Sequence, residues 1–245
     1  MNVFRAVWVL GLLGAPSVTA AQKTILISDT LAANADKLKV NNPAQWLGRI
    51  AGWRFGDYAV ATSKQGPVKT SMSQHFFKVD SSTSVNFSFV LTNKTADSAM
   101  VNAARNGTVK SLRSLDLGKG WLIGSDDVVS ESDNLAAFIT INRDTSDTWE
   151  FVLGVTGNHG YAGVLTNGAR RITVAMASSN RNVLDLRGWP AVGYEFFEDG
   201  RSLGAVQYSG VQPAQFVWLD RTLDARTKLL LAAAMTAVLQ ANRRS

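Results

Sequence analysis

The stretch TLDARTKLLLAAAMTAVLQANRRS, residues 222–245, closes the chain and decides which fold we expect. It is rich in Leu and Ala and has neither Gly nor Pro, so it predicts a helix over 222–242. Between Leu229 and Leu239 only Thr236 is polar. Eleven consecutive residues cover every direction around a helix, so this helix is apolar all round and is expected to be buried on all sides.

The two ends of this segment carry residues that suit a helix. Asp220 or Thr222 is expected to cap its N-terminus, with Asp224 in the first turn. Arg243 and Arg244 lie at the C-terminal end, where positive charge is favourable. The apolar run rises about 16 Å, roughly half of a bilayer's hydrocarbon core. A helix enclosed by protein is therefore favoured over a transmembrane helix.

Ahead of the helix, from about residue 55 to residue 219, hydrophobic residues recur at every second position. This period of two is typical of antiparallel strands that bury one face. Asn-Gly or Asp-Gly pairs stand at 106–107, 167–168 and 199–200, between strand-like runs. Such pairs favour two-residue hairpin turns, because both central residues take positive φ. We therefore expect about a dozen strands in a barrel or sandwich.

These observations together predict a mainly β fold with a buried C-terminal α-helix. The expected architecture is an antiparallel barrel, closed or nearly closed, around the helix. The alternative is an α+β fold in which the helix packs in a groove of an antiparallel sheet. Residues 55–245 are expected to form a single β-rich domain. Residues 21–54 are expected to be an N-terminal extension with one or two short helices between 31 and 52, where no period of two is found.

Residues 1–20, MNVFRAVWVLGLLGAPSVTA, have the pattern of a secretory signal peptide. Arg5 precedes a short apolar stretch, and small residues follow it, which suits cleavage after Ala20 or Ala21. The stretch is shorter than a membrane span and is interrupted by Pro16. We therefore expect a secreted or periplasmic protein.

The composition excludes several kinds of site. The chain has no Cys, which excludes disulfides, thiolate metal centres and Cys nucleophiles. The two His residues, His75 and His159, cannot form a three-His metal site within one chain. The sequence has no nucleophile elbow and no P-loop. We expect no metal ion and no cofactor.

The net charge of +6 comes from scattered residues. The sequence has no run of basic residues and no basic stripe interleaved with aromatic residues, so nothing in it indicates nucleic acid as a partner. A diffuse positive charge favours weak attraction to anionic surfaces, such as an anionic lipid or another envelope component. Arg170, Arg171 and Arg201 each follow an expected hairpin turn. They are the predicted ligand-binding residues, as a basic rim at one end of the barrel that holds an anionic headgroup. Ordinary solvated strand starts are the alternative.

Acidic residues offer a second kind of chemistry. Glu150 and Glu195 lie on strand-like segments and are the candidates for a glycosidase carboxylate pair, although surface positions explain both more simply. Residues 125–133, SDDVVSESD, are expected to form an acidic surface loop rather than a Ca²⁺ site. The Gly-rich segment 154–163 is expected to be a hairpin turn.

The end of the chain also resembles a known family. GRSLGAVQY, followed by FVWLDRTLDARTKLLLAAAMTAVL, is similar to the end of the tubby-like fold, especially its phospholipid scramblase branch. There a Gly-containing strand is followed by an apolar strand, a Leu-Asp pair, a Lys and a Leu/Ala helix, which Gly204, Leu223, Asp224 and Lys228 match here. The resemblance covers about 45 residues. It implies a helix that threads a closed β-barrel, and it places no headgroup-binding residue on this chain.

The predicted function is an exported, non-enzymatic module that binds a lipid or another anionic amphipathic ligand at the cell envelope. A structural or partner-binding envelope protein is one alternative. An exported hydrolase that uses carboxylates on glycans is the other. The sequence leaves the oligomeric state open.

Overall fold

The structure is a computed structural model, which describes residues 24–41, 50–75, 78–112, 115–116, 122–123, 128–155, 161–180, 190–209 and 215–242. Its helices are α1 (Asp29–Asn34), the 3₁₀ turn η1 (Thr145–Asp147) and α2 (Ala225–Ala241). Its strands are β1 (Ala35–Lys39), β2 (Arg54–Phe55), β3 (Tyr58–Gln65), β4 (Lys69–His75), β5 (Lys78–Thr92), β6 (Ser98–Leu112), β7 (Leu115–Asp116), β8 (Leu122–Ile123), β9 (Val128–Ile141), β10 (Thr148–Val155), β11 (Tyr161–Thr166), β12 (Arg171–Ser178), β13 (Val192–Glu198), β14 (Arg201–Ser209) and β15 (Phe216–Asp220).

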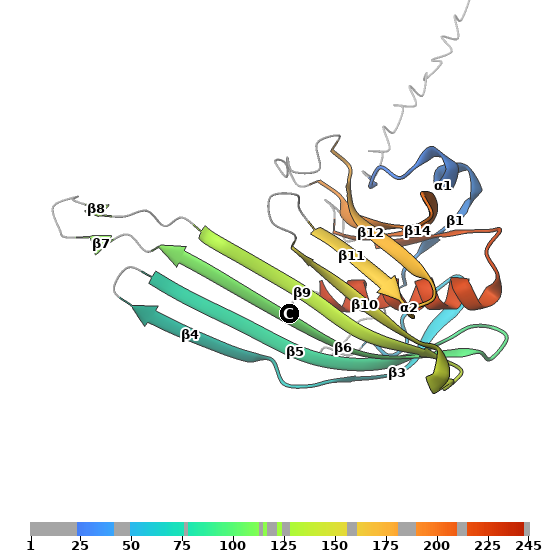
Figure 1. Cartoon of the computed structure of the whole chain (residues 1–245), viewed down its shortest axis with the longest axis horizontal. Coiled ribbons are helices and arrows are strands. Elements are labelled where there is room, and N and C mark those ends of the chain that lie inside the picture. The colour runs from blue at the N-terminus through green and yellow to red at the C-terminus, as the bar shows by residue number, and fades with distance from the viewer. Residues whose placement is uncertain are drawn as a thin grey trace, which may run out of the picture.

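One antiparallel sheet curls into a nearly closed barrel (Figure 1). Its strand order is β1-β15-β14-β13-β12-β11-β10-β9-β6-β5-β3-β2, with β4 beside β5. The two ends of this order meet just beyond β1. There Asn41 N donates to Arg54 O at 2.8 Å, and Arg54 N donates to Asn41 O at 3.2 Å. The predicted barrel architecture is therefore confirmed.

Helix α2 is buried against the inner face of this sheet, as expected. No residue from Leu231 to Leu239 exposes any surface. The inward rows of the strands, among them Phe89, Phe151 and Phe196, pack in the same apolar cluster as the helix. At Gly204 an added Cβ would lie 2.7 Å from the Trp218 carbonyl on β15 and 2.7 Å from Cε of Met235 on the helix, so a larger residue there would crowd the neighbouring strand and displace the Met235 side chain. Within the described residues no helix is long and apolar enough to cross a bilayer.

The start of α2 differs slightly from the prediction. The N-cap is Asp224, whose side chain accepts a hydrogen bond from Thr227 N at 2.9 Å. Asp220 and Thr222 do not cap the helix. Asp220 instead accepts from Thr222 N at 2.8 Å and closes a turn after β15. A short polar side chain accepts a hydrogen bond from whichever backbone N–H lies within its reach. In the turn after β15 that group is Thr222 N, so Asp220 closes the turn and does not cap the helix.

Three strands continue beyond the barrel. β5, β6 and β9 are 15, 15 and 14 residues long, and together with β4 their far halves form a flat extension that we call the fin (Figure 1). The turn predicted at 106–107 is wrong, because Gly107 lies inside β6 and pairs with Thr83 on one side and Asp133 on the other. Continuous pairing on both edges outweighs the local turn preference of Asn-Gly. The segment 125–133 is not a loop throughout, since residues 128–133 belong to β9 and 125–127 lie outside the described residues.

The turn at 199–200 agrees with the prediction, and the one at 167–168 agrees only in part. Asp199 and Gly200 both have positive φ, +50° and +78°, and join β13 to β14. Residues 167–168 also lie in a turn between β11 and β12, but this turn spans four residues, 167–170. Gly168 has φ +87°, whereas Asn167 does not have positive φ. The Gly-rich segment joins β10 to β11, but residues 156–160, with His159, lie outside the described residues. His75 is the last residue of β4.

The N-terminal segment is part of the barrel rather than a separate extension. Only α1 is helical in its described residues, and β1 pairs with β15 over five residues. A period of two is hard to see in so short a strand, yet β15 offers it a free edge, and Lys37 Nζ lies 4.3 Å from the centre of the Phe216 ring. We call residues 24–34 the strap. Its Ile25 and Leu31 pack on the outer face of the sheet with Trp218.

Candidate functional site on the outer face of the sheet

Arg170, the first predicted ligand-binding residue, is held by a carboxylate. Its Nε and Nη2 donate to the two oxygens of Glu198, each at 2.9 Å. Its guanidinium also lies over the ring of Trp149 at 5.6 Å. These hydrogen bonds raise the pKa of Arg170 above its ordinary value. Glu198 therefore occupies the bidentate edge that an anionic headgroup would need.

Arg201 also has an acidic partner, at the same end of the barrel where α2 begins. Its Nη2 donates to Asp220, whose side chain is almost fully buried, and to Thr222. Burial alone raises the pKa of Asp220, but hydrogen bonds from Thr222 and Arg201 outweigh this and hold the pKa below its usual range. The structure thus brings Arg170 and Arg201 to one rim, each beside a carboxylate. Their predicted role in ligand binding stays a prediction.

Arg171 follows Arg170 directly, as the first residue of β12, and its side chain lies on the outer face. It is exposed and, within the described residues, its side chain has no ion pair or hydrogen bond. It ends a cross-strand row that crosses seven strands of the outer face. In order from β3 to β12, the row is Lys64, Ser88, Asn102, Phe138, Glu150, Thr166 and Arg171.

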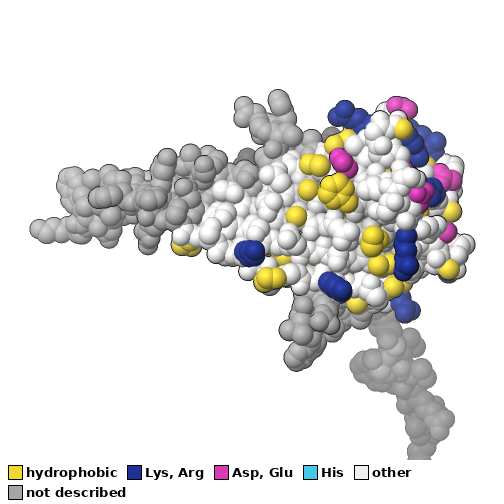
Figure 2. Space-filling model, turned by 60° about the horizontal axis from the view of Figure 1, so that its bottom comes forward, with side chains coloured by type: hydrophobic (Ala, Val, Ile, Leu, Met, Phe, Trp, Pro, Cys, Tyr) yellow, Lys and Arg dark blue, Asp and Glu magenta, His cyan; other side chains and the backbone are white. Residues whose placement is uncertain are grey.

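The neighbouring row is apolar at its centre. Ala104, Ala136, Val152 and Val164 follow one another across β6, β9, β10 and β11. Val152 is 49% exposed and the adjacent Phe138 is 55% exposed, which are high values for such side chains on a sheet. Figure 2 shows hydrophobic side chains spread over a largely uncharged surface, with charged side chains gathered toward the end away from the fin.

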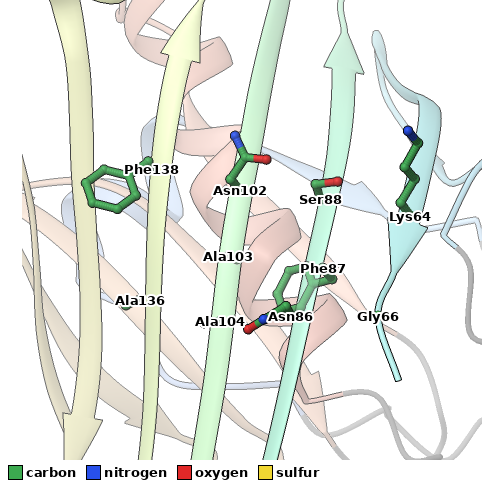
Figure 3. A pocket seen from close by; sticks show the side chains of 10 residues that line it. All are labelled: Lys64, Gly66, Asn86, Phe87, Ser88, Asn102, Ala103, Ala104, Ala136 and Phe138. Atoms are coloured by element: carbon green, nitrogen blue, oxygen red, sulfur yellow. The ribbon is translucent and has the colours of Figure 1, made fainter. Parts of the chain in front are cut away.

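Between β3 and β9 this face is hollowed. The hollow has a volume of about 460 Å³, within the range of small-molecule sites. Figure 3 shows Lys64, Ser88, Asn102 and Phe138 on adjacent strands, with Asn86, Ala104 and Ala136 in the row beside them. Small residues at the floor and larger ones at the edge create the depression. We call it the outer hollow.

The outer hollow combines one cation with an apolar wall. Lys64 is exposed, and within the described residues its side chain has no ion pair or hydrogen bond. Ser88 and Asn102 add a hydroxyl and an amide beside it. Phe138 supplies an exposed aromatic ring on the other side of Asn102. This arrangement can hold a ligand that is anionic at one end and apolar at the other.

The two candidate carboxylates do not form a pair. Glu150 is exposed on β10, whereas Glu195 on β13 is 7% exposed beneath the strap. Three strand spacings separate β10 from β13, about 14 Å along the sheet and more than the roughly 5–9.5 Å that glycosidases use. Glu195 accepts from Ser202 Oγ at 2.6 Å and from Ser28 N at 3.0 Å. The surface position expected for Glu195 is wrong, because the strap covers it. No group of three or more potential metal ligands occurs among the described residues.

Neither Lys64 nor Phe138 is among the site residues predicted from the sequence. A signal for Phe138 was present, because it stands between Ala137 and Ile139 at a position where the alternation predicts a polar residue. Lys64 had no such signal, since an exposed Lys on a strand is ordinary. Only the register of β3, β5, β6 and β9 brings the two together.

Comparisons with known proteins identify no relative. No family model matches the chain, and neither a curated protein nor a solved structure does. The resemblance of residues 200–239 to the tubby-like fold therefore stays an expectation, while the barrel and its buried helix stand on the structure itself.

Proposed function

We propose that this protein is an exported, non-enzymatic module that binds an anionic lipid at the cell envelope, through the outer hollow and the apolar row beside it. The observation that carries the proposal is the position of Lys64. Its unpaired ammonium group stands at the edge of a hollow whose opposite side is the exposed ring of Phe138. A phosphate or carboxylate headgroup would pair with Lys64, and an acyl chain would cover Phe138 and Val152.

The energies of these contacts suit weak, reversible binding. Fully burying one large apolar side chain contributes about 1.5–3 kcal/mol, and Phe138 and Val152 are each about half exposed beforehand. Each basic residue near an anionic membrane surface adds about 1 kcal/mol. Arg171, at the other end of the row, is six strands away around the barrel and faces away from Lys64, so Lys64 is the cation that meets the headgroup.

One residue on this face opposes anionic lipid. Glu150 lies between Phe138 and Thr166 in the same row and is exposed. Its carboxylate repels an anionic surface, so the Glu150→Gln variant should bind anionic vesicles more tightly than the natural chain. A gain larger than the one from neutralising an exposed carboxylate elsewhere, such as Asp36 on β1, is a result that an unrelated face of the protein would not give.

Export and the family resemblance support the proposal from the sequence side. A chain with a signal peptide meets lipid surfaces outside the cytoplasm, where anionic headgroups are available. The tubby-like resemblance of residues 200–239 points in the same direction, because its scramblase branch is named for phospholipid. The fin favours a second candidate, a partner-binding envelope protein. Beyond β4 no further strand pairs within the described residues, and such an edge can accept a strand from another chain.

Co-sedimentation with vesicles tests the lipid proposal. The mature chain is mixed at low salt with vesicles of phosphatidylcholine alone or of phosphatidylcholine with phosphatidylglycerol. We expect binding to the anionic vesicles only, a several-fold loss in Lys64→Gln and Phe138→Ser, and a gain in Glu150→Gln. The matched controls are Lys39→Gln on β1 and Leu26→Ser, since Leu26 is 54% exposed on the strap and lies outside the hollow. Equal binding by all variants, or none by the natural chain, overturns the proposal.

A further inference from the structure

A second pocket opens at the rim of the barrel, away from the outer hollow. It lies between α1 and the β13–β14 turn and has a volume of about 530 Å³. Three segments far apart in the sequence line it: α1 with Thr30 and Asn34, the turn with Asp199 and Arg201, and Thr222 after β15. We call it the turn pocket.

Arg201, Asp220 and Asn34 of the turn pocket are held in place before any ligand arrives. Asp220 is buried beneath Arg201 and accepts from its Nη2, from Thr222 N and from Thr222 Oγ1. Asn34 Nδ2 donates to Thr30 O at 3.0 Å. A pocket whose polar groups are already fixed loses little conformational entropy on binding.

Several hydrogen-bonding groups in this pocket remain available. Within the described residues Asp199 has no ion pair or hydrogen bond through its carboxylate, and Asn34 Oδ1 accepts none. Only Nη2 of the Arg201 guanidinium is engaged there, which leaves Nε and Nη1 free to donate. The pocket therefore offers a free carboxylate, a free amide oxygen and free guanidinium N–H groups to one ligand.

The charges and side-chain types in the turn pocket narrow the class of ligand that it can bind. Two carboxylates, Asp199 and Asp220, line the pocket together with one guanidinium, so an anion is disfavoured. Asp220 is already saturated by hydrogen bonds, and one free carboxylate is too few for a calcium ion, which takes six to eight oxygens. Among the described residues no large apolar side chain lines the pocket, so an acyl chain finds no surface on them. A cation would pair with Asp199 but would leave the free N–H groups of Arg201 without acceptors. The free donors and acceptors together therefore fit an uncharged molecule rich in hydroxyl groups.

We infer that the turn pocket binds a neutral sugar. Asp199 accepts hydrogen bonds from two neighbouring hydroxyls of the sugar, and Arg201 and Asn34 contact the hydroxyls on its opposite edge. The carboxylate and guanidinium match the spacing of adjacent hydroxyls because both are planar and bidentate. This site is independent of lipid binding at the outer hollow, which uses other strands. Since no aromatic ring covers the sugar, a monosaccharide is expected to bind with a millimolar dissociation constant.

Titration of the mature protein with single sugars tests this inference. Glucose, galactose, N-acetylglucosamine and glucuronate are added separately, and binding is followed by saturation-transfer NMR and by calorimetry. We expect saturable binding of at least one neutral sugar and weaker binding of glucuronate than of glucose. Asp199→Asn should weaken the binding of that sugar at least about tenfold. Asn readily takes the positive φ of this turn, so the variant keeps the backbone.

The controls separate loss of the site from loss of the fold. Asp57→Asn changes another exposed Asp, next to β2 and outside the turn pocket, and should bind as the natural chain does. If Asp199→Asn melts at a lower temperature than the natural chain, Asn34→Ser serves instead and should also weaken binding. The inference is overturned if no neutral sugar binds, if glucuronate binds best, or if neither variant weakens binding.

Discussion

Strands β13, β14 and β15 are covered on both faces, and the two covers are built differently. Inside the barrel α2 contacts the sheet almost entirely through apolar side chains. Outside, the strap meets two buried polar residues of the sheet, Gln207 and Glu195. A helix satisfies its own backbone hydrogen bonds, so its cover can be apolar. The irregular part of the strap, before α1, cannot pair its own backbone N–H groups, so the sheet must supply their hydrogen-bond acceptors.

The contacts of the strap show this requirement residue by residue. Gln207 Oε1 accepts from Ile25 N at 3.1 Å, and Glu195 Oε1 accepts from Ser28 N at 3.0 Å. Between them Leu26 N donates to the carbonyl of Ser178 at 3.0 Å. Three backbone N–H groups of the strap are thus paired across the sheet surface. The difference between the covers predicts that core substitutions act on the whole barrel, whereas strap substitutions act locally.

The largest effect is expected inside. Leu231→Ala leaves a cavity at a position with no exposed surface and should cost about 2–5 kcal/mol of unfolding free energy. Urea unfolding followed by far-UV circular dichroism measures it. The control Leu26→Ala, at the exposed strap position, should stay within about 0.5 kcal/mol. A loss below about 1 kcal/mol in Leu231→Ala would contradict the enclosure of α2.

A smaller effect is expected where Gln207 and Glu195 accept hydrogen bonds from the strap. Gln207→Ala removes the acceptor of Ile25 N and should cost about 1–3 kcal/mol, because a buried donor is left unpaired. The strap should also open before the barrel, so limited proteolysis should cut near Ile25 while the circular dichroism of the barrel persists. Leu231→Ala should instead make cleavage follow global unfolding. Identical cleavage kinetics in the two variants would show that the strap does not open separately from the barrel around α2.

The inner cover could be predicted from the sequence, and the outer one could not. The run 229–239 and the alternating rows are local patterns, and each states which face is buried before any partner is known. The turn at Asp199 and Gly200 is local in the same sense. The barrel follows, because a helix buried on all sides and many antiparallel strands have few joint solutions.

The strap and the candidate sites depend on pairs that are distant in the sequence. Glu195 and Ser28 lie 167 positions apart, and neither residue predicts the other. At 106–107 a local pattern gave the wrong answer, because pairing with β5 and β9 overrode it. The outer hollow needs the register of four strands, and the turn pocket needs three separate segments. Tertiary pairing decides which distant residues become neighbours, and local propensities do not predict this pairing.

Helix α2 has a polar contact of its own, the N-cap Asp224. Asp224→Ala removes the cap on Thr227 N and should cost about 1 kcal/mol, less than the strap substitution in the same urea assay. Asp224→Asn keeps a capping oxygen and should recover most of that loss. A cost in Asp224→Ala as large as in Leu231→Ala would mean that the cap, and not burial, holds α2 in the barrel.

Acid should weaken the end of the barrel where α2 begins. Hydrogen bonds from Arg226 and Asn167 hold the pKa of Asp147 below its ordinary value, and hydrogen bonds from Thr227 do the same for Asp224. A carboxyl with a depressed folded-state pKa stabilises the fold above its unfolded-state pKa, and this stability is lost as the pH falls through the folded-state pKa. The melting temperature should therefore fall below about pH 4. Asp147→Asn should make this fall shallower, and an unchanged slope would contradict the assignment.

The smallest effect is expected where the strap meets water. Arg221 donates to Ala33 O at 2.9 Å and to Asn34 O at 3.0 Å, and its side chain is exposed. Because water can replace the guanidinium there, Arg221→Gln should cost only about 0.5 kcal/mol, below what the melting temperature resolves well. Hydrogen exchange is the sharper measurement. Amides of α1 should exchange faster in the variant while those of α2 keep their protection, whereas faster exchange in both would show that the outer cover supports the inner one after all.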